Sequence, residues 1–246
     1  MRRYNFNAMM WEDIERSPRV LTNEELIPAK KPKKRINKQV RKTKVRIPSR
    51  TKVSKTSFKF ENSPQKDTIN TALAKHGNKR GCAIVLDGPN MHTTKTLKKY
   101  GWKKENIYIP NFDDNDYKAI KRKHINTFNK PLGTQILGMN RNSVGLIYAD
   151  YMCSLNGNAN CSPLIDMERI FDNKIMMDKS VLGITISMRN HPKEKKAFVN
   201  ADVQRCISEI TRFAYLNKYT AILVNTGGTY KNGGVMWSGL FYIVKV

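Results

Sequence analysis

Carboxylates follow three apolar runs of this chain, each at the point where a predicted strand ends. The run 81–86 ends at Asp87, the run 144–149 ends at Asp150, and Asp113–Asp114 follows the run between them. A short apolar run closed by turn residues is typical of a buried strand. Ligands of open α/β sheets bind outside the carboxyl ends of the strands, so we expect these acids to meet at a ligand site.

Each of these side chains also has a purely structural interpretation. Asp87 is expected either to bind a cofactor or to cap a helix predicted over 92–100. Asp150 is expected either to act in a site or to close a turn. In a site, Asp150 would orient a nucleophile or accept a proton, and Tyr151 would stack on a base or line the pocket. The histidines and cysteines lack metal-ligand spacing, so we expect no metal site.

The elements that must position these acids alternate between strands and helices. A predicted glycine-rich turn over 225–234 joins the last two strands, with no helix between them, so we expect these strands to pair antiparallel. The predicted strands are 83–86, 106–109, 133–137, 144–149, 181–186, 220–224 and 236–244, and the predicted helices are 67–76, 92–100, 114–123, 163–171 and 198–217.

The positive charge of the chain is concentrated near its beginning. The net charge of the 246 residues is +25, and residues 30–59 contain 14 basic residues and no acid. Such a segment repels itself and buries little apolar surface. We therefore expect an extended or disordered arm over 1–65, followed by an α/β domain over 66–246.

The expected partner of this arm is nucleic acid, the commonest polyanion met by a strongly basic chain. Two alternatives remain open: a localisation signal at 30–35, or an arm that lies across a neighbouring protein in an assembly. The proposed nucleic-acid contacts are Lys30, Lys31, Lys33, Lys34, Arg35, Arg41, Lys42, Lys44 and Arg46.

The four cysteines are far apart and form no C-x-x-C pair. We therefore expect reduced thiols and an intracellular location, in the nucleus or cytoplasm. Cys153 is expected to be a small buried hydrophobe and not a nucleophile. No apolar run approaches the length of a membrane helix, so we expect no membrane partner.

The order of elements over 67–246 resembles the class I S-adenosylmethionine-dependent methyltransferases, whose seventh strand enters antiparallel after the sixth. The segments 149–158 and 185–189 also look like methyltransferase-like proteins of large DNA viruses. The resemblance implies a Rossmann-like, mostly parallel seven-stranded sheet with an antiparallel C-terminal hairpin, and S-adenosylmethionine as cofactor. It implies cofactor binding by Asp87, Gly88 and Asn90, ribose binding by Asp113 or Asp114, and a catalytic or substrate-positioning role for Asp150 and Tyr151.

Two functions follow as hypotheses. The first is methyl transfer from S-adenosylmethionine to nucleic acid. The second is a catalytically inactive protein with the same fold. It would be a basic structural or packaging protein, viral and part of the virion, whose arm binds nucleic acid or neighbouring subunits. The second is motivated by the turn after Asp87, where Gly88 is the one glycine and Pro89 lacks a backbone N–H.

Overall fold

The computed structural model describes residues 63–158, 161–188, 196–231 and 235–246. The arm predicted over 1–65 lies outside these residues up to Asn62, and so do its proposed contacts from Lys30 to Arg46. The described part contains strands β1 (Cys82–Val85), β2 (Ile107–Pro110), β3 (Thr127–Phe128), β4 (Val144–Asp150), β5 (Met176–Ser187), β6 (Tyr219–Lys231) and β7 (Val235–Lys245), and helices α1 (Pro64–His76), α2 (His92–Lys99), α3 (Asp114–Lys121), α4 (Leu132–Leu137), α5 (Pro163–Asp172) and α6 (Lys196–Leu216).

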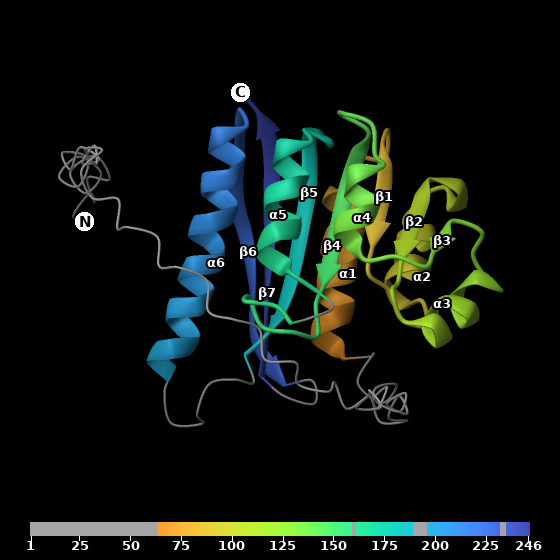
Figure 1. Ribbon diagram of the computed structural model, residues 1–246, viewed down its shortest axis with the longest axis horizontal. Coiled ribbons are helices and arrows are strands. Elements are labelled where there is room, and N and C mark those ends of the chain that lie inside the picture. The colour runs from red at the N-terminus through yellow and green to blue at the C-terminus, as the bar shows by residue number, and fades with distance from the viewer. Residues whose placement is uncertain (1–62, 159–160, 189–195, 232–234) are drawn as a thin grey trace, which may run out of the picture. The chain divides into compact units, whose positions relative to one another are not determined.

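The seven strands form one sheet in the order β3-β2-β1-β4-β5-β7-β6 (Figure 1). Strands β1 to β5 pair in parallel, whereas β7 lies between β5 and β6 and runs antiparallel to both. This is the strand order of the class I methyltransferase fold. The expected α/β sheet with an antiparallel C-terminal hairpin is confirmed.

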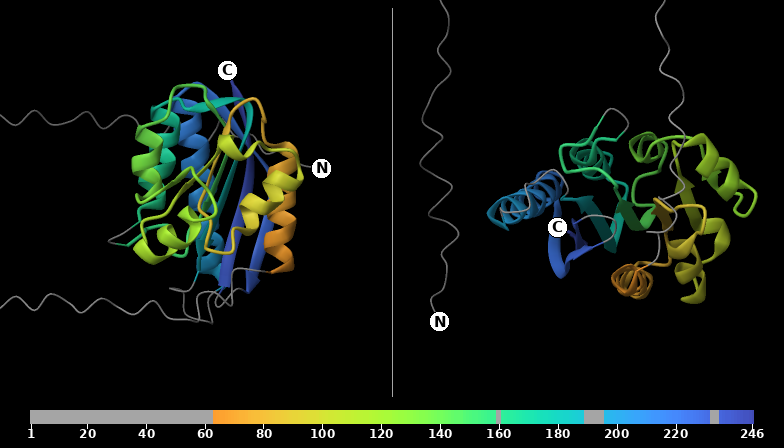
Figure 2. Two further views of the ribbon diagram at one scale, coloured as in Figure 1. Left: turned by 90° about the vertical axis from the view of Figure 1, so that its right-hand side faces the viewer. Right: turned by 90° about the horizontal axis from the view of Figure 1, so that it is seen from below.

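Helices cover both faces of the sheet (Figure 2). One core contains apolar side chains of α4, α5 and α6, and the other contains those of α1, α2 and α3. The central strand β4 is buried along 144–149, because helices cover it on both sides. A strand that is buried on both faces has a continuous apolar sequence, which explains why this strand can be predicted from the sequence.

Two predicted elements are wrong. Residues 133–137, expected as a strand, lie in helix α4, and the third strand is the two-residue segment Thr127–Phe128. The glycine-rich run 225–234 is not simply a turn either, because β6 continues through Lys231 and pairs with β7 as far as Val235. Two bulges in β6, at 223–225 and 226–228, accommodate the extra residues of this long strand.

Helix α1 begins earlier than predicted. The Ser63 side chain caps it by accepting a hydrogen bond from the Lys66 amide, and Pro64 occupies the first turn. This start places Lys66 in the first turn, from which its side chain reaches the end of β4. Among the described residues, no helix is both long and apolar enough to cross a membrane.

Candidate functional site

A cavity of about 320 Å³ lies where β1, β2 and β4 end. Its volume is within the range of small-molecule sites. The first turn of α2 contributes His92 and Thr93 to its wall, so the turn after β1 does not fill the space. The lining residues are Lys66, Asn70, Leu86, Asp87, Gly88, His92, Thr93, Pro110, Asn111, Phe112, Asp113, Asp116, Asp150, Tyr151, Met152, Cys153, Asn158 and Cys161.

Asp87 both lines this cavity and caps helix α2. Its Oδ2 accepts a hydrogen bond from the Thr94 amide at 2.7 Å, which satisfies one of the unpaired N–H groups at the helix start. Burial raises the pKa of the Asp87 carboxyl to about 6; hydrogen bonds from Thr94 and Thr93 oppose this rise, and the charge of Asp150 adds to it. Asp87 is therefore a carboxylate that gains from a nearby positive charge.

The segment after β2 forms the second wall of the cavity. The Asn111 side chain donates to the Asp87 carbonyl at 3.4 Å and accepts from the Asp113 amide at 2.9 Å. Asp113 caps helix α3 by accepting from the amides of Asn115 and Asp116, in both cases through Oδ1. The cap thus leaves Asp113 Oδ2 for a ligand in the cavity.

The Asp150 carboxylate, at the end of β4, forms an ion pair with a lysine of helix α1. Lys66 Nζ lies 2.5 Å from Asp150 Oδ2, and the two side chains are 10% and 13% exposed. The other oxygen, Asp150 Oδ1, is buried and has no hydrogen-bond partner among the described residues. A buried acceptor without a donor is costly, so this atom is suited to a donor that enters the cavity.

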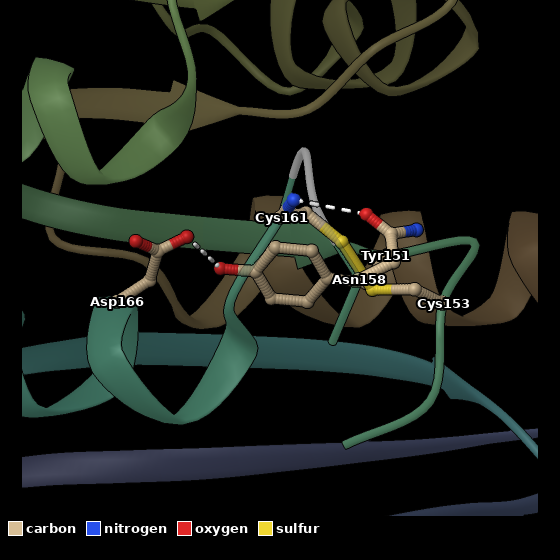
Figure 3. Close-up of a disulfide and its surroundings, with 5 residues drawn as sticks. All are labelled: Tyr151, Cys153, Asn158, Cys161 and Asp166. Carbon is tan, nitrogen blue, oxygen red and sulfur yellow. Dashed lines mark hydrogen bonds between the residues drawn. A yellow bond between two sulfur atoms is a disulfide. The ribbon is translucent and has the colours of Figure 1, made fainter. Parts of the chain in front are cut away.

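The hydroxyl of Tyr151 is committed to a structural contact. It donates to Asp166 Oδ2 at 2.7 Å, and both residues are buried (Figure 3). Burial and the Asp166 charge raise the pKa of Tyr151 well above its usual value, while burial raises the pKa of Asp166 against the lowering effects of Tyr151 and Arg169. Tyr151 therefore presents its ring, and not a free hydroxyl, to a ligand.

The loop after β4 folds back on itself beside Tyr151. Cys153 and Cys161 are joined in a disulfide, and the backbone amide of Cys161 donates to the side-chain oxygen of Asn158 at 3.1 Å (Figure 3). The expectation of reduced thiols is wrong for this pair, because the turn at Gly157 brings two cysteines eight residues apart to the same place. Cys153 is nevertheless buried, as expected, and Cys82 and Cys206 are free.

The structure brings together most of the side chains predicted from the strand ends. Asp87, Gly88, Asp113, Asp150 and Tyr151 all line the cavity. Asn90 and Asp114 are exposed and are not part of the lining; the Asp114 carboxylate instead accepts a hydrogen bond from Asn129. Their cofactor roles stay predictions. Of the two aspartates expected to bind the ribose, Asp113 lines the cavity and Asp114 does not.

Sequence reasoning missed Lys66, Asn70 and Asp116 as lining residues. Lys66 is 84 residues from Asp150, and no local pattern links the two. Asp116 had a usable signal, since it lies three residues after the helix cap Asp113 and so on the same face of the first turn.

The cavity is acidic in a chain that is strongly basic overall. Four aspartates line it against one lysine, and His92 and Tyr151 are further titratable side chains of its lining. Within the described ranges, no group of three or more His, Cys, Asp or Glu residues is placed to hold a metal ion. The acidic lining suits a ligand that carries positive charge together with hydroxyl or amino donors.

No protein-family model matches this chain, and no curated protein matches its sequence. Among solved structures it is similar to M. jannaschii TYW2 in complex with AdoMet, with 14% identity over 75% of this chain and 78% of that chain and a TM-score of 0.48. P. horikoshii TYW2 in complex with MeSAdo gives 13% identity over 75% of this chain and 65% of that chain, with a TM-score of 0.47. N-methyltransferase NodS from Bradyrhizobium japonicum WM9 gives 8% identity over 75% and 99%, with a TM-score of 0.47.

Proposed function

We propose that this protein binds S-adenosylmethionine in the cavity at the ends of β1, β2 and β4 and transfers its methyl group. The observation that carries the proposal is the convergence of Asp87, Asp113 and Asp150, one after each of these strands, on a single cavity in a class I methyltransferase fold. The cofactor carries a positively charged sulfur and an ammonium group, and the acidic lining of the cavity complements both.

The residues present fit the parts of this cofactor. Asp87 would hold the ammonium group, and Asp113 Oδ2 would accept hydrogen bonds from the ribose hydroxyls. Phe112 and Met152 are both 52% exposed and line the same cavity, so they offer apolar surface to the adenine ring. When bound, the cofactor supplies a methyl group activated by attachment to cationic sulfur.

Asp150 would position the group that receives the methyl. Its unpartnered Oδ1 is an acceptor for the N–H or O–H of a nucleophile, while Lys66 holds Oδ2 and fixes the carboxylate in place. The ring of Tyr151 completes the wall beside it. These two residues thus keep their predicted role as the positioning pair for the methyl acceptor.

The methyl acceptor that we propose is nucleic acid. The support is the charge of the chain: 19 basic and 6 acidic residues over 1–66, with the basic run from Lys30 to Arg46 inside it. A segment of this kind would deliver the domain to a polyanion through phosphate contacts that depend strongly on salt.

A second candidate is the inactive structural or packaging protein, with the arm as its nucleic-acid or assembly contact. The specific observation that favours it is the single glycine, Gly88, in the turn after β1. Both candidates share the fold and the arm, so ligand binding at the cavity separates them.

Isothermal titration with S-adenosylmethionine and S-adenosylhomocysteine tests the proposal. Both should bind with micromolar affinity, and Asp113→Asn should weaken them at least about tenfold, since a charge-assisted hydrogen bond to the ribose is lost. Asparagine is as good a helix cap as aspartate, so this variant should stay folded. Asp114→Asn, next to it but outside the cavity, is the matched control. If millimolar ligand gave neither binding heat nor a shift in melting temperature, the methyltransferase proposal would be wrong and the inactive structural protein would be favoured.

A further inference from the structure

A second hollow, of about 550 Å³, lies at the opposite edge of the sheet from the cofactor cavity. It is bordered by the residues that begin β1, β4 and β5, by β2 and β3, and by helix α4. Five of its lining residues carry the argument: Arg80, Tyr108, Phe128, Lys130 and Gln135.

An aromatic pair lines part of this hollow. The rings of Tyr108 on β2 and Phe128 on β3 are nearly parallel, at 9°, with centroids 5.9 Å apart. Both side chains are half-buried, so part of their ring surface is open, and Lys130 Nζ lies 5.1 Å from the Phe128 ring centroid. Aromatic surface with a cation beside it is the arrangement on which unpaired nucleobases stack.

A buried amide faces the same hollow without a full set of partners. Gln135 on α4 is 4% exposed, and within the part of the chain that the structure describes its Nε2 donates to the Met139 sulfur alone, at 3.2 Å. Its Oε1 has no hydrogen-bond partner among the described residues. Because a buried orphan acceptor is costly, a donor from a ligand would be favoured there, and amides pair well with the donor and acceptor edges of bases.

Exposed cations lie on the turns that lead into the strands, at the same edge of the sheet as the hollow. Lys79 and Arg80 precede β1, Lys104 precedes β2, Arg141 precedes β4 and Lys174 precedes β5, and all five are exposed. Three exposed acids, Glu105, Asp172 and Asp178, lie near these five cations. This edge is therefore basic, in contrast to the acidic cofactor edge, and suits a chain of phosphates.

We infer that this hollow is a binding site for single-stranded nucleic acid. One unpaired base would lie against Tyr108 and Phe128 with its polar edge toward Gln135, and the flanking phosphates would contact Lys130 and Arg80. A duplex cannot present a base face in this way, because its bases are stacked and paired. The site is separate from the cofactor cavity and does not depend on methyl transfer or on the arm.

Fluorescence titration of the full chain with a short single strand containing 2-aminopurine tests this site, because stacking of that base changes its emission. At about 0.3 M salt, where the contribution of the arm is weakened, Phe128→Leu and Gln135→Leu should each weaken binding about tenfold. Phe128→Leu should also abolish the emission change. Tyr215→Leu, which removes an exposed ring from α6, is the matched control and should bind as the wild type does.

Thermal melts show that any loss arises at the site and not from unfolding. Leucine at 135 removes an unsatisfied buried amide and should leave the melting temperature unchanged or raised. Wild-type binding by both Phe128→Leu and Gln135→Leu would overturn the inference. Equal affinity for the matching duplex would also overturn it, and binding of a mononucleotide as tightly as of the strand would assign the hollow to free nucleotides instead.

Discussion

Lys66 Nζ lies 2.5 Å from Asp150 Oδ2 and thereby joins the first turn of helix α1 to the end of the central strand β4. The pair is mostly shielded from water, and it lies in the wall of the cavity at the ends of β1, β2 and β4. It fixes one carboxylate oxygen and leaves the other, Oδ1, without a partner. The same contact therefore stabilises the fold and prepares an acceptor for a ligand.

Replacing Lys66 with methionine should destabilise the protein by about 3 kcal/mol, because it leaves the Asp150 charge buried and uncompensated. Asp150→Asn in the same chain should recover most of this loss. Urea denaturation of the single and double variants measures the coupling between the two side chains.

The control for this cycle is the ion pair between Arg212 and Glu209 on α6, which is much more exposed, at 54% and 28%. Arg212→Met should cost less than about 1 kcal/mol. Equal costs for Lys66→Met and Arg212→Met would show that burial gives the Lys66–Asp150 pair no special weight.

Tyr151→Phe should destabilise the protein by about 1–3 kcal/mol, since it removes the donor from the buried Asp166 carboxylate. Tyr215→Phe, at an exposed position, should change nothing measurable. Affinity for S-adenosylmethionine should survive Tyr151→Phe, because the proposed contact uses the ring. A variant of normal stability that had lost methyl transfer would instead assign the hydroxyl a catalytic role.

Most of the fold can be predicted from the sequence because its buried strands are continuous apolar runs closed by turn residues. β3 could not be found, because a two-residue strand at the edge of a sheet has no periodicity. The sequence predicts the third strand over 133–137 instead, since a short apolar run does not distinguish a strand from a helix. Likewise, the glycines of 225–231 locally indicate a turn, but these residues pair with β7 and therefore form part of strand β6.

The part of the candidate site that lies at the strand ends could be predicted from the sequence, because one rule of sheet geometry governs it. Strand ends in a parallel sheet meet at one edge, which brought Asp87, Asp113 and Asp150 together. Contacts between distant parts of the chain follow no such rule. Lys66 on Asp150 and Tyr151 on Asp166 depend on how helices α1 and α5 pack, and the pairing of Cys153 with Cys161 depends on the path of the loop between them.

Gly145→Ala should destabilise the protein by about 3 kcal/mol or more, because the new Cβ would lie 1.8 Å from the backbone oxygen of Asn78. The turn cannot move away easily, since the Asn78 amide donates to the Gly145 carbonyl at 3.0 Å. Gly138→Ala, whose Cβ would come no nearer than 3.7 Å to the Gln135 oxygen, should stay within about 1 kcal/mol of wild type. Soluble yield and urea midpoints compare the two, and a tolerated alanine at 145 would mean that β4 and this turn are less closely packed.

Asp87 should make stability depend on pH in the acid range. Its pKa is raised from 3.8 to about 6 in the folded protein, so the folded state binds the proton more tightly than the unfolded state. The resulting stabilisation is complete below pH 4 and is lost as the pH rises through 6, by up to about 3 kcal/mol. The Asp87→Asn variant lacks this titratable carboxyl and therefore lacks its contribution to the pH dependence. Urea denaturation from pH 4 to 7 should therefore show wild type falling relative to the variant, and a constant difference would contradict the raised pKa.

Binding of S-adenosylmethionine should show the opposite dependence, because a cationic ligand beside Asp87 favours the ionised carboxylate. Below pH 6 the free protein holds a proton at Asp87 that must leave on binding, so affinity should fall by up to about tenfold per pH unit. Titration calorimetry at pH 5.5 in two buffers of different ionisation enthalpy should detect this released proton. Asp87→Asn should bind more weakly, release no proton and show a nearly flat profile from pH 5 to 7. The same steep profile in that variant would place the titrating group elsewhere in the cavity.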